Sequence, residues 1–180
     1  MSEKSTLRDS LLKKRKQIPA ASRHKKSRLV FKKLFRAPEF RKAAHVALYY
    51  GVVGEVGTRA FLKKVLKTKK LYLPEAVISG KKLVFRRFRD FSDLRKNSYA
   101  IMEPKKSCSQ RSLARMDLIV VPGVGFDRKG GRLGRGGGYY DRALRRLRKV
   151  PTIGICFREQ LVKKIPMQTH DVKVDRVITD

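Results

Sequence analysis

The sequence predicts an α/β sandwich built around a largely parallel sheet. Short apolar segments of β type alternate along the chain with segments whose apolar residues recur at helical spacing. Such alternation is typical of parallel sheets covered by helices. The length of 180 residues, 41% of them apolar, is that of one domain with a substantial core. No repeat or change of composition divides the chain, so we expect a single domain over residues 1–180.

The first predicted elements are two amphipathic helices, Ser5–Gln17 and Ser22–Phe35, separated by Ile18-Pro19. The short apolar run Ala44–Tyr50 predicts a strand that ends in a loop at Gly51. Thr58 is a suitable N-cap for a third helix, which extends through Lys67.

The second half of the chain is predicted to consist mainly of strands. We expect Pro74 to end the first of them, Asp90–Pro104 to be mostly connection, and a short helix to lie near Glu159–Lys164. The strands themselves are predicted at Leu71–Leu73, Leu83–Phe88, Leu118–Val121, Ile153–Phe157 and Val174–Ile178.

The most informative segment is Asp117–Asp141, DLIVVPGVGFDRKGGRLGRGGGYYD, which holds eight of the thirteen glycines. A buried strand precedes the glycines, and a helical pattern follows them, with Tyr140, Ala143, Leu144 and Leu147 on one face. Backbone N–H groups at the start of such a helix bind phosphate well. Arg132 and Arg135 add positive charge. The segment therefore predicts a phosphate-binding site.

This loop differs from the common phosphate-binding motifs. No Gly-Lys-Ser/Thr follows the glycines, and the dinucleotide pattern G-x-G-x-x-G is matched only loosely. The alternative interpretation is a flexible, solvated loop. The adjacent Tyr139-Tyr140-Asp141 and the two arginines placed three residues apart between glycines favour a binding site.

The string GGRLGRGGGYYDR, preceded by VVPGVGFD, resembles the signature of the 5-formyltetrahydrofolate cyclo-ligase (5,10-methenyltetrahydrofolate synthetase) family. Three other segments resemble family motifs in the same order: KSTLR at Lys4–Arg8, GEVGT at Gly54–Thr58, and HDVKVDRVIT at His170–Thr179. The resemblance spans nearly the whole chain. It implies a three-layer α/β/α sandwich of Rossmann-like topology.

The resemblance also implies an activity. Members of this family are ligases of folate one-carbon metabolism. They convert 5-formyltetrahydrofolate to 5,10-methenyltetrahydrofolate in an ATP- and Mg²⁺-dependent reaction that releases ADP and phosphate. The formyl oxygen is phosphorylated, N10 attacks, and phosphate departs.

The same resemblance assigns roles to individual residues. Arg135 is implied to be catalytic because it occupies the family position nearest the reacting groups. Tyr50, Glu55 and Tyr140 are implied to bind the folate, and Asp141 and Asp175 to bind magnesium. The implied ATP-binding residues are Lys4, Arg8, Arg132, Leu133, Gly134, Arg135, Gly136, Gly137, Gly138, Tyr139 and Tyr140.

Charge and composition bear on partners and location. The net charge of +31 would favour a nucleic acid or another anionic surface. However, the basic N-terminal stretch also carries apolar residues at helical spacing, so we expect its lysines to form the solvated face of packed helices and nucleic acid not to be the partner. No apolar run approaches the ~20 residues of a membrane span, and Cys108 and Cys156 have no metal-ligand spacing. We expect a cytoplasmic monomer.

Two rival functions remain open at the level of the sequence. A sugar-phosphate or coenzyme A enzyme of similar architecture would explain the glycine-rich loop, but not Lys4 and Arg8 or the C-terminal motif. A nucleic-acid-binding protein would explain the charge, but not the residues of the predicted site.

Overall fold

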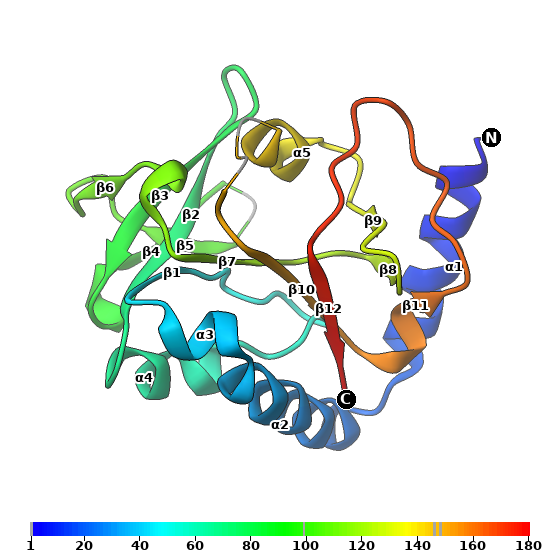
Figure 1. Ribbon diagram of the computed structural model, residues 1–180, viewed down its shortest axis with the longest axis horizontal. Helices are drawn as coiled ribbons and strands as arrows, with labels where there is room; N and C mark the ends of the chain where they lie inside the picture. Colours follow the sequence, from blue (N-terminus) through cyan, green and yellow to red (C-terminus); the bar gives the residue numbers. More distant parts are fainter. Residues whose placement is uncertain (1, 99, 146, 148) are drawn as a thin grey trace.

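In the computed structural model, which describes residues 2–98, 100–145, 147 and 149–180, seven strands form the central sheet in the order β12-β10-β7-β1-β2-β3-β6 (Figure 1). The first five run parallel to one another. β3 runs antiparallel to β2, and β6 runs antiparallel to β3. The prediction of an α/β fold with a mostly parallel sheet is confirmed. The strands are β1 His45–Ala47, β2 Lys70–Val77, β3 Lys82–Phe88, β6 Gln110–Arg111, β7 Leu118–Val121, β10 Thr152–Cys156 and β12 Arg176–Thr179.

Helices cover both faces of this sheet. On one face, α2 packs Val30, Phe31 and Leu34 against alternate residues of the parallel strands. On the other face, Leu144 of α5 and Phe126 pack against the residues in between, such as Ile119 and Val121. All four residues of β7 are buried because each face of the strand is covered. The helices are α1 Glu3–Gln17, α2 Ala20–Arg36, α3 Pro38–Lys42, α4 Arg59–Leu66 and α5 Tyr139–Leu144.

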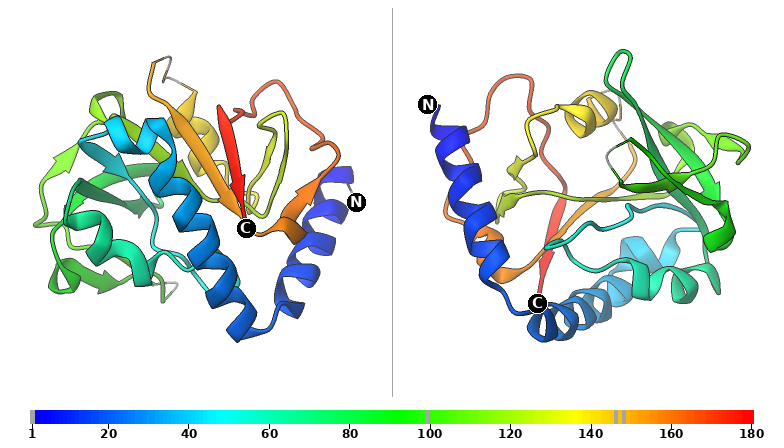
Figure 2. Two further views of the ribbon diagram at one scale, coloured as in Figure 1. Left: turned by 60° about the horizontal axis from the view of Figure 1, so that its bottom comes forward. Right: turned by 180° about the vertical axis from the view of Figure 1, so that it is seen from behind.

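Helix α1 lies at one end of the molecule, beside a small second sheet (Figure 2). This sheet has the order β11-β8-β9, with β8 at Gly125–Asp127, β9 at Arg132–Leu133 and β11 at Leu161–Val162. Leu11 of α1 packs into the cluster formed by Val124, Leu133 and Ile165. The glycine-rich stretch is therefore partly a β-hairpin anchored on the N-terminal helix.

Three local predictions were wrong. Pro74 does not end β2, because beyond Tyr72 the strand pairs only with β3 in this sheet and a proline is tolerated as on an edge strand. Asp90–Pro104 contains a hairpin, formed by β4 Leu94–Lys96 and β5 Met102–Pro104. The helix expected near Glu159–Lys164 is a 3₁₀ turn, Arg158–Gln160, that leads into β11.

The helix after the glycine-rich loop is shorter than predicted. It ends at Leu144, and Leu147 lies outside it while still packing against the same core cluster. Residue 146, which falls within the predicted helical pattern, lies outside the described residues.

Asp127 holds the turn between β8 and β9. Its carboxylate is buried and accepts hydrogen bonds from the backbone N–H groups of Lys129 at 2.8 Å, Gly131 at 2.9 Å and Ile165 at 2.9 Å. Burial alone would raise the pKa of Asp127, but these three bonds outweigh it and hold the pKa below its usual value. One carboxylate thus fixes the hairpin that leads into the glycine-rich loop.

We expect Asp127→Asn to lower the free energy of unfolding by about 1–3 kcal/mol at pH 7, because an amide cannot accept from all three buried donors. Urea denaturation of both proteins measures the difference. Since the folded-state pKa lies below the unfolded value of about 3.9, this stabilisation is present above that value and is lost as the pH falls through the folded-state pKa. An equal difference at pH 7 and pH 2.5 would contradict the assignment to an ionised carboxylate.

Candidate functional site

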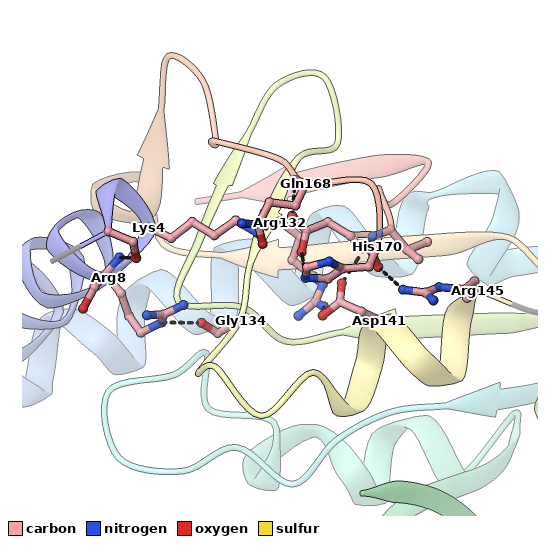
Figure 3. A network of polar contacts seen from close by, with 12 residues as sticks. Lys4, Arg8, Arg132, Gly134, Asp141, Arg145, Gln168 and His170 are labelled. Carbon is pink, nitrogen blue, oxygen red and sulfur yellow. Dashed lines mark hydrogen bonds and ion pairs between the residues drawn. The ribbon is translucent and has the colours of Figure 1, made fainter.

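A cavity of about 460 Å³ lies at the carboxyl ends of the parallel strands. The residues after β7 and those of the glycine-rich loop line it, and so do the start of α1 and the segment before β12 (Figure 3). This edge is where ligands bind in open α/β sheets. The charged residues that line the cavity are Lys4, Arg8, Glu55, Arg132, Arg135, Asp141 and Asp171.

Arg132 is a buried cation at the base of the cavity, with only 5% of its surface exposed. Its Nη2 lies 2.7 Å from Oδ2 of Asp141, and its guanidinium lies 5.8 Å from the centre of the Tyr140 ring. Its Nε has no hydrogen-bond partner among the described residues. The side chain is therefore held rigidly and still offers a free donor.

Arg135 differs from Arg132 in its exposure to solvent. Its side chain is 57% exposed, and its Nη2 lies 2.9 Å from Oε1 of Glu55. The loop that follows requires glycine at two positions, because Gly136 has φ +101° and Gly138 φ +65°. Gly138 directly precedes the first residue of α5, so the loop delivers its backbone N–H groups to the start of a helix.

Helix α1 brings two further cations to the cavity. Lys4 and Arg8 stand one helical turn apart, and Nε of Arg8 donates to the carbonyl oxygen of Gly134 at 2.9 Å. Lys4 forms an ion pair with Asp171, and its Nζ also lies 3.3 Å from Oε1 of Gln168. Lys4 and Arg8 therefore line the same cavity as the glycine-rich loop, although more than 120 positions separate them from it in the sequence.

Asp171 and Gln168 are site residues to which the sequence reasoning assigned no role. Burial alone would raise the pKa of Asp171, but the hydrogen bonds from Lys4 and from the Gln168 N–H outweigh it and lower the pKa. The sequence signal that could have identified Asp171 is the His170-Asp171 pair at the start of the C-terminal motif. This aspartate lies in a non-helical segment before β12.

The structure does not bring Asp175 to this cavity. Its Oδ2 accepts hydrogen bonds from the backbone N–H of Thr152 at 2.8 Å and from the Thr152 hydroxyl at 2.7 Å. These bonds join the beginnings of β10 and β12, at the opposite end of the strands from the cavity. Asp141 lines the cavity, and Asp171, from the segment before β12, lines it as well.

The tyrosines fall into different places. Tyr139 and Tyr140 line the cavity, whereas Tyr50 is half-buried against the core and is not among the lining residues. The hydroxyl of Tyr140 is buried without a hydrogen-bond partner among the described residues. Burial and the nearby Glu55 raise the pKa of Tyr140 well above its usual value, although Arg132 acts in the opposite direction. Tyr140 thus offers a neutral, unsatisfied hydroxyl.

His170 contributes mainly through its backbone. Its carbonyl oxygen accepts a hydrogen bond from Nη2 of Arg145 at 2.7 Å, and its ring lies at the cavity rim, with Nε2 3.8 Å from Asp171. This bond ties the loop before β12 to the end of α5, in agreement with a structural role.

These features define an α/β protein with a cavity at the carboxyl edge of its parallel strands, lined by a glycine-rich loop and four cationic side chains. The model of the 5-formyltetrahydrofolate cyclo-ligase family matches residues 1–180. The chain therefore belongs to this family.

Individual relatives agree with this assignment. The chain is 30% identical over 189 residues to the mouse 5-formyltetrahydrofolate cyclo-ligase, with 98% of this chain and 93% of the relative covered. It is 31% identical over 176 residues to the Haemophilus influenzae cyclo-ligase, with 94% of each covered.

Solved structures agree as well. The NMR structure of the Aquifex aeolicus 5,10-methenyltetrahydrofolate synthetase matches with a TM-score of 0.87 and 36% identity, over 98% of this chain and 89% of that one. The 5,10-methenyltetrahydrofolate synthetase from Mycoplasma pneumoniae matches with a TM-score of 0.80 and 26% identity, over 99% of each chain.

Proposed function

We propose that this protein converts 5-formyltetrahydrofolate to 5,10-methenyltetrahydrofolate at the expense of ATP, with release of ADP and phosphate. The observation that carries the proposal is the cavity itself. It combines the glycine-rich loop and four cations with a carboxylate, Glu55, that faces them across an ion pair with Arg135. The glycine-rich loop and the cations suit a triphosphate, and the carboxylate of Glu55 suits the hydrogen-bond donors of a pterin ring.

The reaction needs activation because a formamide carbon is a poor electrophile and its oxygen a poor leaving group. Transfer of the γ-phosphoryl group of ATP to the formyl oxygen gives an imidoyl phosphate and ADP. N10 then forms a bond to the formyl carbon and loses its proton, the carbon–oxygen bond breaks, and phosphate leaves. Such a transfer depends on in-line positioning and on cations around the phosphoryl oxygens.

We assign the cations to two roles according to their burial. Arg132 is fixed by Asp141 and Tyr140, so it is suited to hold the phosphates in place. Arg135 is exposed, and its ion pair among the described residues is with Glu55, so it can turn toward the transferred phosphoryl group when substrates bind. Lys4 and Arg8 reach the same cavity from α1 and are suited to bind the remaining phosphate oxygens.

The residues present are compatible with the magnesium ion that the family resemblance implies. Asp141 and Asp171 both line the cavity, and each is now held by a cation, Arg132 and Lys4 respectively. Carboxylate oxygens together with phosphate oxygens are the donors that Mg²⁺ prefers. When bound, the ion would neutralise charge on the phosphates. We therefore propose Asp141 and Asp171, in place of Asp141 and Asp175, as the pair that holds it.

The proposed activity is tested by the near-ultraviolet absorbance of methenyltetrahydrofolate. The band should appear when the protein, ATP, Mg²⁺ and 5-formyltetrahydrofolate are all present, and omission of any one should abolish it. ADP and phosphate should form in amounts equal to the methenyl product. ATP hydrolysis without the band, or the band without ATP, would overturn the proposed reaction.

We further propose that the protein works in the cytoplasm. Cys108 and Cys156 are both buried and free, which suits a reducing compartment. Burial raises the pKa of Cys156 to about 12, so its thiol is unreactive. No helix in the described part of the chain is long and apolar enough to cross a membrane.

The surplus of basic residues should contribute little to turnover. Lys13, Lys14 and Lys25 are exposed, whereas Lys26 pairs with Glu159 at 2.9 Å and Asp180 at 2.7 Å and is left in place. Replacing the three exposed lysines with glutamine should change kcat/KM by less than roughly threefold at about 0.15 M ionic strength, where the Debye length is about 8 Å. A tenfold loss with an unchanged Tm would show that this surface belongs to the site.

A further inference from the structure

One face of α1 carries more of the site than Lys4 and Arg8. Continuing along the helix from these residues, Leu11 and Arg15 follow at spacings of three and four, so all four positions share a stripe. The first two line the cavity, Leu11 is buried in a core cluster, and Arg15 is buried as well. Arg15 is thus a third cation that α1 turns inward, beneath the loop that holds Glu55.

The burial of Arg15 is unusual for a cation. Only 4% of the residue is exposed, and its Nη1 has no hydrogen-bond partner among the described residues. Nη1 lies 3.8 Å from Oε1 of Glu55. Burial lowers the pKa of Arg15, Glu55 opposes this effect, and Arg135 adds to it. A buried guanidinium with a free donor is costly unless the neighbouring carboxylate compensates it.

The loop that carries Glu55 also packs directly on the Arg15 side chain. Gly54 has φ +85°, and a Cβ added there would lie 3.0 Å from Nε of Arg15. On the other side of Glu55, Oε2 accepts a hydrogen bond from the backbone N–H of Val52 at 3.3 Å. The position of Glu55 is therefore set by Arg15 below it and by its own loop.

Two arginines compete for the same oxygen of Glu55. Arg135 lies at 2.9 Å with a side chain 57% exposed, and Arg15 lies at 3.8 Å with a side chain 5% exposed. Under the function proposed above, Arg135 must leave Glu55 to support the phosphoryl group. Among the described residues, the other cation paired with Glu55 is Arg15, which is then placed to balance the charge of Glu55 and to keep it aimed into the cavity.

We propose that Arg15 is a positioning residue that holds Glu55 for folate recognition once Arg135 has turned to the nucleotide. This proposal rests on the proposed function and deepens it. Arg15 lies outside the lining of the cavity and acts only through Glu55. It links the folate end of the site to the same helix that supplies Lys4 and Arg8 to the nucleotide end.

The test compares Arg15→Gln, Arg15→Met and Arg15→Lys in the full chain, with Lys16→Gln, an exposed neighbour on α1, as the matched control. Arg15→Met keeps an unbranched apolar stem under Gly54 and removes the guanidinium group with its charge and its N–H donors. Calorimetric binding of 5-formyltetrahydrofolate without ATP, KM for each substrate, kcat and Tm are measured for every variant. Glu55→Gln and the double variant Arg15→Gln/Glu55→Gln complete a cycle.

We expect both uncharged variants to raise the Kd and KM for folate by roughly tenfold, as on loss of a charged partner, with KM for ATP changed by less than about twofold. Arg15→Lys should recover part of the affinity, and Lys16→Gln should match the wild type. In the Glu55→Gln background, Arg15→Gln should have almost no further effect. Unchanged folate binding in folded Arg15→Met, or additive effects in the double variant, would overturn the role of Arg15.

Tm values measured without substrate distinguish a failure of this inference from a failure of the proposed function. If the wild type neither binds 5-formyltetrahydrofolate nor forms product, the proposed function is wrong. The shifts in Tm of the same cycle then decide the coupling of Arg15 to Glu55, which requires that the two single shifts do not add. Additive shifts would reject the coupling.

Discussion

Arg135→Ala should lower kcat by roughly 10²–10³-fold, as when one preorganised donor to a developing charge is removed. The side chain is 57% exposed, and its ion pair in the described part of the chain is with Glu55, so its loss should leave the fold intact. Because the interaction forms mainly in the transition state, KM for ATP should change much less than kcat. Steady-state kinetics by methenyltetrahydrofolate absorbance, together with Tm, provide the measurement.

Arg128→Ala is the matched control for this experiment. Arg128 is exposed in the turn between β8 and β9, in the same glycine-rich stretch, but it does not line the cavity. It should retain full activity, because it carries the same surface charge without access to the substrate. An Arg135→Ala protein with more than half of the wild-type turnover would reject the catalytic assignment, and an equal loss in both variants would point to net charge alone.

The extent to which this site could be predicted follows from how local its determinants are. The place of residues 132–138 at a cavity was predictable because the glycines and arginines are adjacent in the sequence and require no partner to be recognised. Phosphate binding by these residues stays a prediction. The hairpin of β8 and β9 was not predictable in the same way, because its turn is held by Asp127 and its packing by Leu11, which lies more than a hundred residues away. Glycine-rich composition alone suggested only a loop.

The strands show the same contrast. β7 was predicted with its observed bounds, since four consecutive apolar residues indicate a strand buried on both faces. The continuation of β2 beyond Pro74 depends on where its neighbour β1 ends, which is a property of the sheet and not of the segment. A proline predicts a boundary only where both neighbours are paired.

The carboxylates show the limit of motif spacing. Asp171 and Asp175 are four residues apart in the same C-terminal motif, and the family resemblance of that motif implied Asp175 as the partner of Asp141. The difference is one of location, because Asp175 joins the beginnings of two strands, whereas Asp171 precedes them and pairs with Lys4 at the cavity. Strand direction fixes the end of the sheet that each residue reaches, and it is the basis for the proposal of Asp171 as the partner of Asp141.

Asp141→Asn should therefore raise the Mg²⁺ concentration for half-maximal activity by at least roughly 10–100-fold, the range found when a group that merely orients a metal ligand is altered. Asp171→Asn should act in the same direction, because its carboxylate lines the same cavity. Asp175→Asn is the matched comparison and should leave the Mg²⁺ requirement unchanged, since its contacts are to Thr152. Mg²⁺ titration of initial rates at saturating ATP and folate measures all three.

The loss of the Asp141 charge also breaks the ion pair with Arg132. A second measurement must therefore show that the change in Mg²⁺ requirement does not come from a general disturbance of the site. Asparagine retains an oxygen for the backbone N–H of Val172, which Asp141 contacts at 3.2 Å, and the loop before β12 should keep its position. We therefore expect the KM for 5-formyltetrahydrofolate at saturating Mg²⁺ to stay within about threefold, because a screened change in charge acts weakly beyond its direct contacts. A raised folate KM with an unchanged Mg²⁺ requirement would reject Asp141 as a metal ligand. A rise in the Mg²⁺ requirement with Asp175→Asn and not with Asp171→Asn would restore Asp175 to the role that its motif first suggested.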